Sequence, residues 1–164
     1  MSKRTRPFLA YVLVFLHIFI GLNGLWGGGA FLLAPNGALM GMPLSTLGKA
    51  PFHDFFVPGL LLFTFLGVYP LAVAYSLWRV PAWRWPDAIN PFKRIHWSWA
   101  ASLAVGVIAV IWILFQVQWV SFSFLQAFIL GWGVLIMLDT LLPGVRQYYT
   151  RDAGSLEVSA QPSR

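Results

Sequence analysis

No cysteine occurs among the 164 residues of the chain. This absence excludes disulfides, thiol catalysis, iron–sulfur clusters and thiolate zinc sites. Charged residues are also scarce, because Asp, Glu, Lys and Arg make up 10% of the chain, against about a quarter in soluble domains. A soluble globular fold is therefore excluded as well.

Acidic residues are the scarcest charged group, since five Asp and Glu stand against eleven Lys and Arg, for a net charge of +6. A basic balance is found in many nucleic-acid-binding proteins, but there the cations form a patch on one folded face. Here they lie in short flanks between apolar runs, which membrane topology and anionic lipid explain. No nucleic-acid partner is predicted.

What the sequence has in abundance is apolar surface, with 59% hydrophobic and 17% aromatic residues. Long apolar runs occupy residues 8–33, 55–78, 97–117 and 124–142. About 20 helical residues cross a hydrocarbon core of about 30 Å, so each run can span a membrane. We predict an all-α membrane protein in which residues 1–149 form one antiparallel bundle of four transmembrane helices. A disordered polar tail is predicted for residues 150–164.

The basic residues give this bundle an orientation. Ten of the eleven Lys and Arg precede the first run, separate the second from the third, or follow the fourth. Only Lys49 lies between the first and second runs. The positive-inside rule therefore predicts that both termini are cytoplasmic.

Capping and helix-breaking residues mark the predicted helix ends. Asn90 precedes a proline and suits the start of the third helix, and Asp54 suits the N-cap of the second. Ser123 and Gln126 match a capping box at the start of the fourth. Pro70 lies inside the second helix, where its missing N–H should cause a kink.

Polar side chains are few inside the predicted spans, and four of them are candidate ligand or relay residues: His17, Asn23, Tyr69 and Asp139. For His17, a neutral hydrogen bond between helices is favoured over haem ligation, which needs a second histidine at similar depth. For Asp139, solvation or an ion pair with Arg146 or with the Lys93 and Arg94 pair is favoured over a proton-relay or ligand role.

The loop between the first two spans offers another candidate pair, His53 and Asp54. Adjacent residues seldom point at one substrate, and no nucleophile or metal triad accompanies this pair or the pair of His17 and Asp139. The chain is therefore predicted to be non-enzymatic, with no cofactor and no metal site.

Glycines crowd the far end of the first span. Gly24 and Gly28 form a small-xxx-small pair, extended by Gly21, and this spacing lets a neighbouring helix approach closely. A phosphate-binding loop would follow a strand and carry a lysine, which is not the pattern here. Helix packing is predicted for all three glycines.

Tryptophans flank the loop between the second and third spans and are interleaved with the cations of residues 79–94. Amphipathic rings favour the headgroup level of a membrane, and cations there attract anionic lipid. This loop is therefore predicted to bind anionic lipid headgroups.

The stretch from Pro35 to Phe63 reads PNGALMGMPLSTLGKAPFHDFFVPGLLLF. Its G-M-P loop and D-F-F-V-P-G helix start, after a glycine-rich helix end, resemble small bacterial four-helix inner-membrane proteins without an assigned function. The layout is also similar, more loosely, to DoxX-like proteins. The resemblance implies a multi-pass protein of the bacterial inner membrane and supplies no catalytic residues.

Two functions fit these patterns. The first is an accessory or assembly bundle that packs against a membrane-protein partner or a second copy of itself, and the glycine face favours it. The alternative is a binder or carrier of a lipid-like or other apolar small molecule. Its cavity would lie at the Pro70 kink, lined by Phe63, Tyr69 and Trp112.

Overall fold

The computed structural model describes residues 5–48 and 50–151 of the chain. Within these residues the fold is all-helical, and four helices are long and apolar enough to cross a membrane. They are α1 (Phe8–Leu33), a composite second helix (Phe56–Arg79), α5 (Trp97–Gln116) and α6 (Phe124–Leu141). The predicted all-α bundle of four transmembrane helices is thus confirmed, because apolar run length alone determines where a chain can cross a bilayer.

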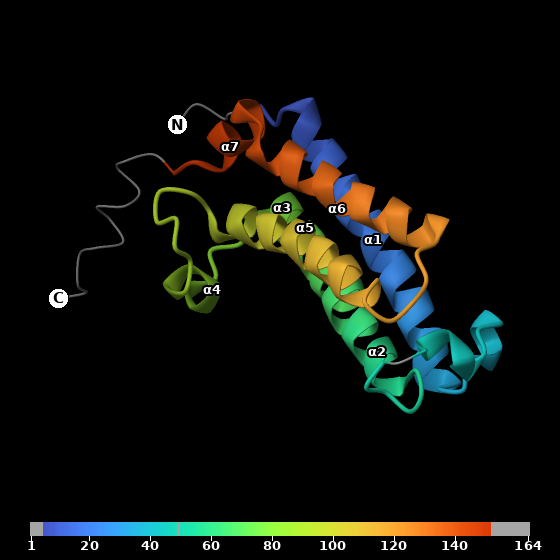
Figure 1. Cartoon of the computed structure of the whole chain (residues 1–164). Helices are drawn as coiled ribbons and strands as arrows, with labels where there is room; N and C mark the ends of the chain where they lie inside the picture. Colours follow the sequence, from blue (N-terminus) through green and yellow to red (C-terminus); the bar gives the residue numbers. More distant parts are fainter. Residues whose placement is uncertain (1–4, 49, 152–164) are drawn as a thin grey trace.

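Shorter elements join and extend these helices. Two 3₁₀ turns (Ala38–Met40 and Leu44–Leu47) lie in the first loop, α4 (Arg84–Ala88) lies in the second, and α7 (Pro143–Tyr149) follows α6. Figure 1 shows α4, α7 and the start of α1 at one end of the bundle, here called the terminal end. The first loop lies at the opposite end, here called the loop end.

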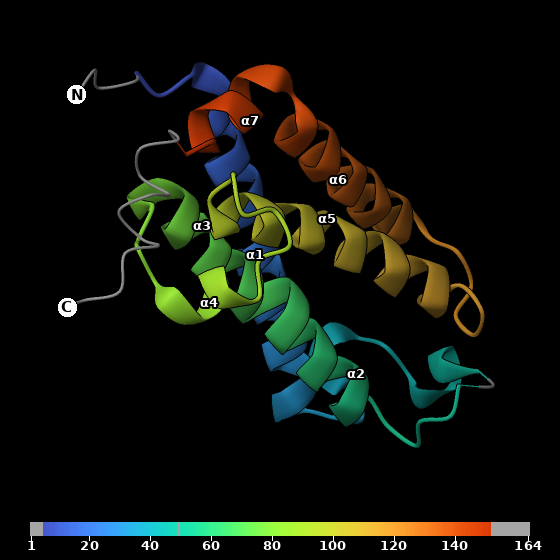
Figure 2. The same cartoon turned by 90° about the vertical axis from the view of Figure 1, so that its left-hand side faces the viewer.

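The spans pack in sequence order. α1 lies against the composite second helix and α5 lies against α6. Figures 1 and 2 show that both pairs run antiparallel. The capping box at the start of α6 supports its tight turn from α5, since Gln126 Oε1 accepts from the N–H of Ser123 at 2.7 Å.

The glycines of α1 face the second helix. A Cβ on Gly24 would lie well under 3.0 Å from the backbone of Leu66, and one on Gly28 would lie equally close to the backbone of Phe63. A Cβ on Gly21 would lie 2.6 Å from the side chain of Leu71. The two helices are therefore packed at a separation that only glycine allows.

Before Pro70, the second helix contains a π-helical segment, which the sequence did not indicate. The helix consists of α2 (Phe56–Leu61), a π-helical segment (Leu62–Val68) and α3 (Tyr69–Arg79). The N–H of Tyr69 donates to the carbonyl of Thr64, five residues back. A widened turn thus accommodates a residue that cannot donate, and Pro70 itself is buried.

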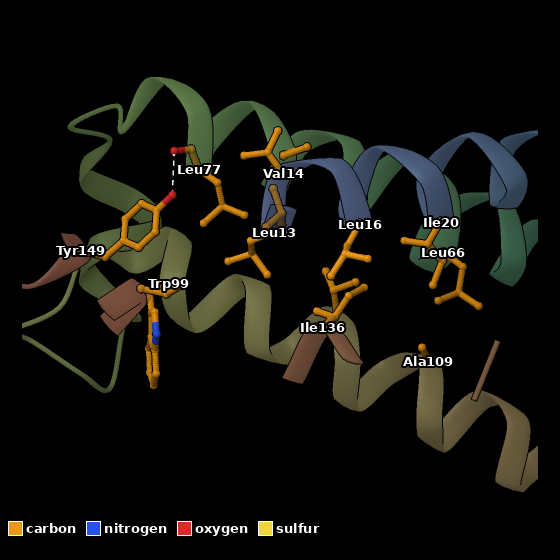
Figure 3. Packing of buried hydrophobic residues seen from close by; sticks show 14 of the residues in the cluster. Leu13, Val14, Leu16, Ile20, Leu66, Leu77, Trp99, Ala109, Ile136 and Tyr149 are labelled. Carbon is orange, nitrogen blue, oxygen red and sulfur yellow. Dashed lines mark hydrogen bonds between the residues drawn. The ribbon is translucent and has the colours of Figure 1, made fainter. Parts of the chain in front are cut away.

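One apolar core extends through the bundle. Figure 3 shows Leu13 and Leu16 of α1 directed at Ile136 of α6. A smaller cluster at the loop end joins Leu47 to Phe31 and Phe55, whose rings stack at 4.7 Å. This second cluster holds the first loop against α1.

The predicted start of the third helix at Asn90 is wrong, because α5 begins only at Trp97. The Asn90 side chain is instead buried against its own loop, where Oδ1 accepts from the N–H of Phe92 and Nδ2 donates to the carbonyl of Ile95. A short amide side chain satisfies loop backbone as readily as it caps a helix.

The first two residues assigned to the tail are held at the terminal end. Thr150 forms an isolated β-bridge with Ile95, and the N–H of Arg151 donates to the carbonyl of Arg94 at 2.9 Å. Arg151 also pairs with Asp87 at 2.5 Å. Residues 152–164 of the predicted tail lie outside the described residues.

Candidate functional site

Three polar side chains from three spans lie in the core: His17 of α1, Ser102 of α5 and Thr140 of α6, all fully buried. The Ser102 and Thr140 hydroxyl oxygens are 2.8 Å apart, and the Thr140 O–H donates to Ile136. His17 Nδ1–H donates to the carbonyl of Leu13 at 2.8 Å, and its ring also faces the backbone of Ser102. Of these hydrogen bonds, the one between Ser102 and Thr140 links two helices, α5 and α6, whereas the other two lie within α1 and α6.

Asp139 is next to Thr140 in sequence but does not join this cluster. Both carboxylate oxygens are buried without a hydrogen-bond partner among the described residues, and so is His17 Nε2. His17 and Asp139 therefore do not form an acid–base pair. The predicted ion pair of Asp139, with Arg146 or with Lys93 and Arg94, is not formed either.

The chemistry open to this cluster is limited. No group of three His, Cys, Asp or Glu side chains able to hold a metal occurs within residues 5–48 and 50–151. Since Nδ1 of His17 donates, Nε2 carries the lone pair of a neutral ring and can only accept. The predicted hydrogen bond of His17 to another helix is therefore not found, because its Nδ1 bonds within α1 and its Nε2 has no hydrogen-bond partner among the described residues.

Asn23 is exposed on α1, where Nδ2 donates to the carbonyl of Phe19 one turn back at 2.8 Å. Phe19 shares this face of the helix and contacts α6, with its ring centroid 4.4 Å from that of Trp132. Farther toward the loop end, α1 and α6 no longer cover each other. Trp26 of α1 is 76% exposed there, and Phe124 of α6 is 85% exposed. Asn23 thus presents an unused carboxamide oxygen outside the bundle, inside a span.

The residues expected to line a cavity are engaged in packing. The Tyr69 O–H donates to the carbonyl of Ala101 at 3.2 Å, Trp112 packs against the main core, and Phe63 lies on Gly28. Two hollows of the described structure lie instead at the terminal end, with volumes of about 490 and 320 Å³. The predicted site at Pro70 coincides with neither.

His53 and Asp54 do not act together. Asp54 Oδ1 accepts from the N–H of Phe56 at 2.9 Å, but the N-cap of α2 is Phe55, so Asp54 lies one residue before the cap position predicted for it. The His53 side chain is exposed and makes no hydrogen bond within the described part of the chain. The pair therefore shows no catalytic arrangement.

Arg6 fastens the start of α1 to two distant segments, which the sequence did not indicate. Its guanidinium donates to the Tyr148 hydroxyl at 3.2 Å and to the carbonyl of Trp78 at 2.6 Å. It also lies 4.7 Å from the Trp78 ring centroid and 5.4 Å from that of Tyr11. Cation–π contacts of this kind hold a cation at an aromatic surface.

Helix α7 was also missed by the sequence reading, although a signal for it exists. Pro143 occupies its first turn, where no N–H is needed, and the buried residues Val145 and Tyr149 are spaced four apart. The Tyr149 O–H donates to the carbonyl of Leu77 at 2.9 Å (Figure 3), and burial raises the pKa of Tyr149. α7 thus ties the chain after α6 to α3.

His96 caps α5. Its Nδ1 accepts from the N–H of Ser98 at 3.2 Å, and its Nε2–H donates to the carbonyl of Pro81 at 3.1 Å. Acceptance at Nδ1 requires the neutral ring, and burial lowers the pKa of His96, although the hydrogen bond to Pro81 raises it. His96 also faces the charges of Asp87 and Arg151, which act on this pKa in opposite directions.

Acidification is expected to destabilise the protein through His96. Because its pKa is lower in the folded state, the unfolded chain binds more protons as the pH falls below about 6.5, and folded stability decreases there. The variant His96→Asn, which can still cap a helix, should flatten the dependence of the thermal midpoint on pH between about pH 7 and 5. The exposed control His53→Asn should leave this pH dependence unchanged. An equal dependence of the thermal midpoint on pH in the wild type and both variants would contradict the role given to His96.

Comparisons with protein-family models, with curated proteins and with solved structures found no match.

Proposed function

We propose that the chain is a non-enzymatic assembly bundle of the bacterial inner membrane, with both termini cytoplasmic, that associates with a second copy of itself through α1. The observation that carries the proposal is the outward-facing carboxamide of Asn23 inside a membrane-spanning helix. The basic flanks and the sequence resemblance support the compartment and the orientation.

Nδ2 of Asn23 already donates to Phe19, but a carboxamide oxygen without a donor is costly in hydrocarbon, and a hydrogen bond from a neighbouring helix removes that cost. A carboxamide donates and accepts, so two Asn23 side chains can bond reciprocally. Two copies inserted in the same direction and related by a two-fold axis along the membrane normal present the same residue at the same depth. A different partner would have to supply its own polar group at that depth.

The glycine face, which the sequence offered as the association surface, is already used inside the monomer against the second helix. The surface around Asn23 remains uncovered, since Leu22 is 56% exposed and Trp26 is 76% exposed. A polar side chain such as Asn23 can hydrogen-bond across a contact between transmembrane helices, and the apolar side chains beside it can pack around that bond. The outward face of α1 is therefore the contact surface of the proposed dimer.

Cysteine cross-linking tests this proposal cleanly because the chain has no native cysteine. We expect Trp26→Cys, one turn from Asn23 on the same side of α1, to form a disulfide-linked dimer in native membranes. Ile111→Cys, which is also exposed but lies on α5, should not. Adding Asn23→Leu to Trp26→Cys should weaken dimerisation about tenfold, the upper range for one interhelical hydrogen bond.

Two results would contradict the proposal. One is a strictly monomeric protein in mild detergent that gives no cross-link from Trp26→Cys in membranes. The other is a cross-link from Trp26→Cys to a different protein only, which would replace self-association by a hetero-complex. As a control, Thr64→Leu removes another exposed polar side chain within a span and should leave dimerisation unchanged.

A further inference from the structure

A basic hollow of about 320 Å³ lies at the terminal end, between the loop that precedes α5 and helix α7. Its lining residues come from two segments far apart in the sequence: Phe92, Lys93, Arg94, Ile95, Arg146 and Thr150. The sequence places Arg146 outside the basic loop of residues 79–94, so the combination exists only in the folded chain.

Two guanidiniums at this hollow are unpaired. Arg94 and Arg146 are exposed, and their side chains form no hydrogen bond or ion pair with any described residue. Lys93 donates to the carbonyls of Asp87 and Ala88 at 3.1 and 3.0 Å, which leaves one of its three donors unused.

The Asp87 carboxylate, whose backbone carbonyl accepts from Lys93, does not neutralise these cations. Asp87 is paired with Arg151, whose hydrogen bond holds the pKa of Asp87 below its usual range. Lys93, Arg94 and Arg146 therefore leave the hollow with a net positive charge.

Backbone hydrogen bonds fix the two walls of the hollow relative to each other. The N–H of His96 donates to the carbonyl of Tyr149 at 2.8 Å, and the N–H of Arg151 donates to the carbonyl of Arg94 at 2.9 Å. Ile95 and Thr150 form a β-bridge between these two bonds. A ligand at the hollow thus meets cations whose backbones are already positioned.

The hollow lies just beyond the spans, because α5 begins at Trp97 and α6 ends at Leu141. Exposed apolar side chains lie beside its cations, with Phe92 43% exposed and Ile89 77% exposed. Guanidinium groups bind phosphate oxygens in a bidentate manner, and apolar side chains at this depth suit acyl chains. We propose that this hollow binds the phosphate of an anionic phospholipid headgroup.

The test uses the full chain purified in a mild neutral detergent and titrated with dioctanoyl phosphatidylglycerol. Arg94→Gln/Arg146→Gln is expected to weaken binding about 30-fold, as for two cations near a phosphate. Arg79→Gln/Arg84→Gln removes the same charge from exposed arginines that do not line the hollow and should change binding less than about threefold. All four side chains are exposed, so the variants should fold, which thermal midpoints will verify.

Two further ligands identify the source of the phosphate. Glycerol phosphate, which lacks acyl chains, and dioctanoyl phosphatidylcholine, which has no net charge, should both bind at least about tenfold more weakly than the anionic lipid. Equal losses in the two double variants would overturn the proposal in favour of diffuse surface attraction. Binding of glycerol phosphate as tight as that of the lipid would overturn it in favour of a soluble phosphate ligand.

Discussion

Replacing Gly24 with alanine is expected to lower the free energy of unfolding by about 3 kcal/mol, the upper range for an overpacked core. The added Cβ would collide with the carbonyl group of Leu66. A backbone cannot rotate away as a side chain can, so α1 and the second helix would have to separate. Reversible denaturation in mixed detergent micelles, followed by circular dichroism, measures the effect.

Two glycines with open surroundings, one on α1 and one on α6, provide controls. A Cβ on Gly29 would meet the Phe63 ring no closer than 3.9 Å, and one on Gly131 would meet nothing within 4 Å. Alanine is the better helix former, so Gly29→Ala and Gly131→Ala should be neutral or stabilising by up to about 1 kcal/mol. If Gly24→Ala behaved like these two variants, the close approach of α1 to the second helix would be refuted.

Replacing Asp139 with asparagine is expected to raise the free energy of unfolding by about 2 kcal/mol. The Asp139 carboxylate is buried without a partner in the described structure, and a carboxylate at the centre of a span costs about 2.5–3.5 kcal/mol, with less near the end. Asparagine keeps the shape and removes the charge. The same mixed-micelle denaturation measures the gain.

Asp54→Asn is the control for Asp139→Asn, because the Asp54 carboxylate accepts a hydrogen bond at the start of α2. Its loss of charge should lower stability by no more than about 0.5 kcal/mol. If Asp139→Asn instead destabilised the protein, the carboxylate would have to be paired in the membrane, and a ligand or relay role would regain support. A rise in stability in Asp139→Asn would argue against a ligand or relay role for Asp139.

Local signals in the sequence predicted much of the helix framework. The ends of the four spans agree with the apolar runs to within one residue, and Gln126 and Asp54 make the backbone hydrogen bonds expected near helix starts. Each of these features depends on residues no more than a few positions apart. The prediction for Asn90 was wrong because its side chain accepts a hydrogen bond from the loop backbone, which is just as local, instead of capping a helix.

The candidate sites depended on contacts that no local pattern encodes. His17 and Asp139 looked alike in sequence, as single ionisable groups in apolar runs. Only the rotation and depth of α1 and α6 placed His17 beside Ser102 and left Asp139 alone. The outward direction of Asn23 is likewise a consequence of where α6 stops covering α1.

The sequence by itself determined that the chain is an all-α bundle of four transmembrane helices. The reason is that each apolar run is long enough, as a helix, to cross the hydrocarbon core of a membrane. Only the tertiary structure decided that the glycines of α1 are used within the monomer and that Arg146 joins Lys93 and Arg94 at one hollow. It also decided that Arg6 and His96 fasten the terminal end. The reason is that such contacts join residues distant in sequence, and helix packing sets which of them meet.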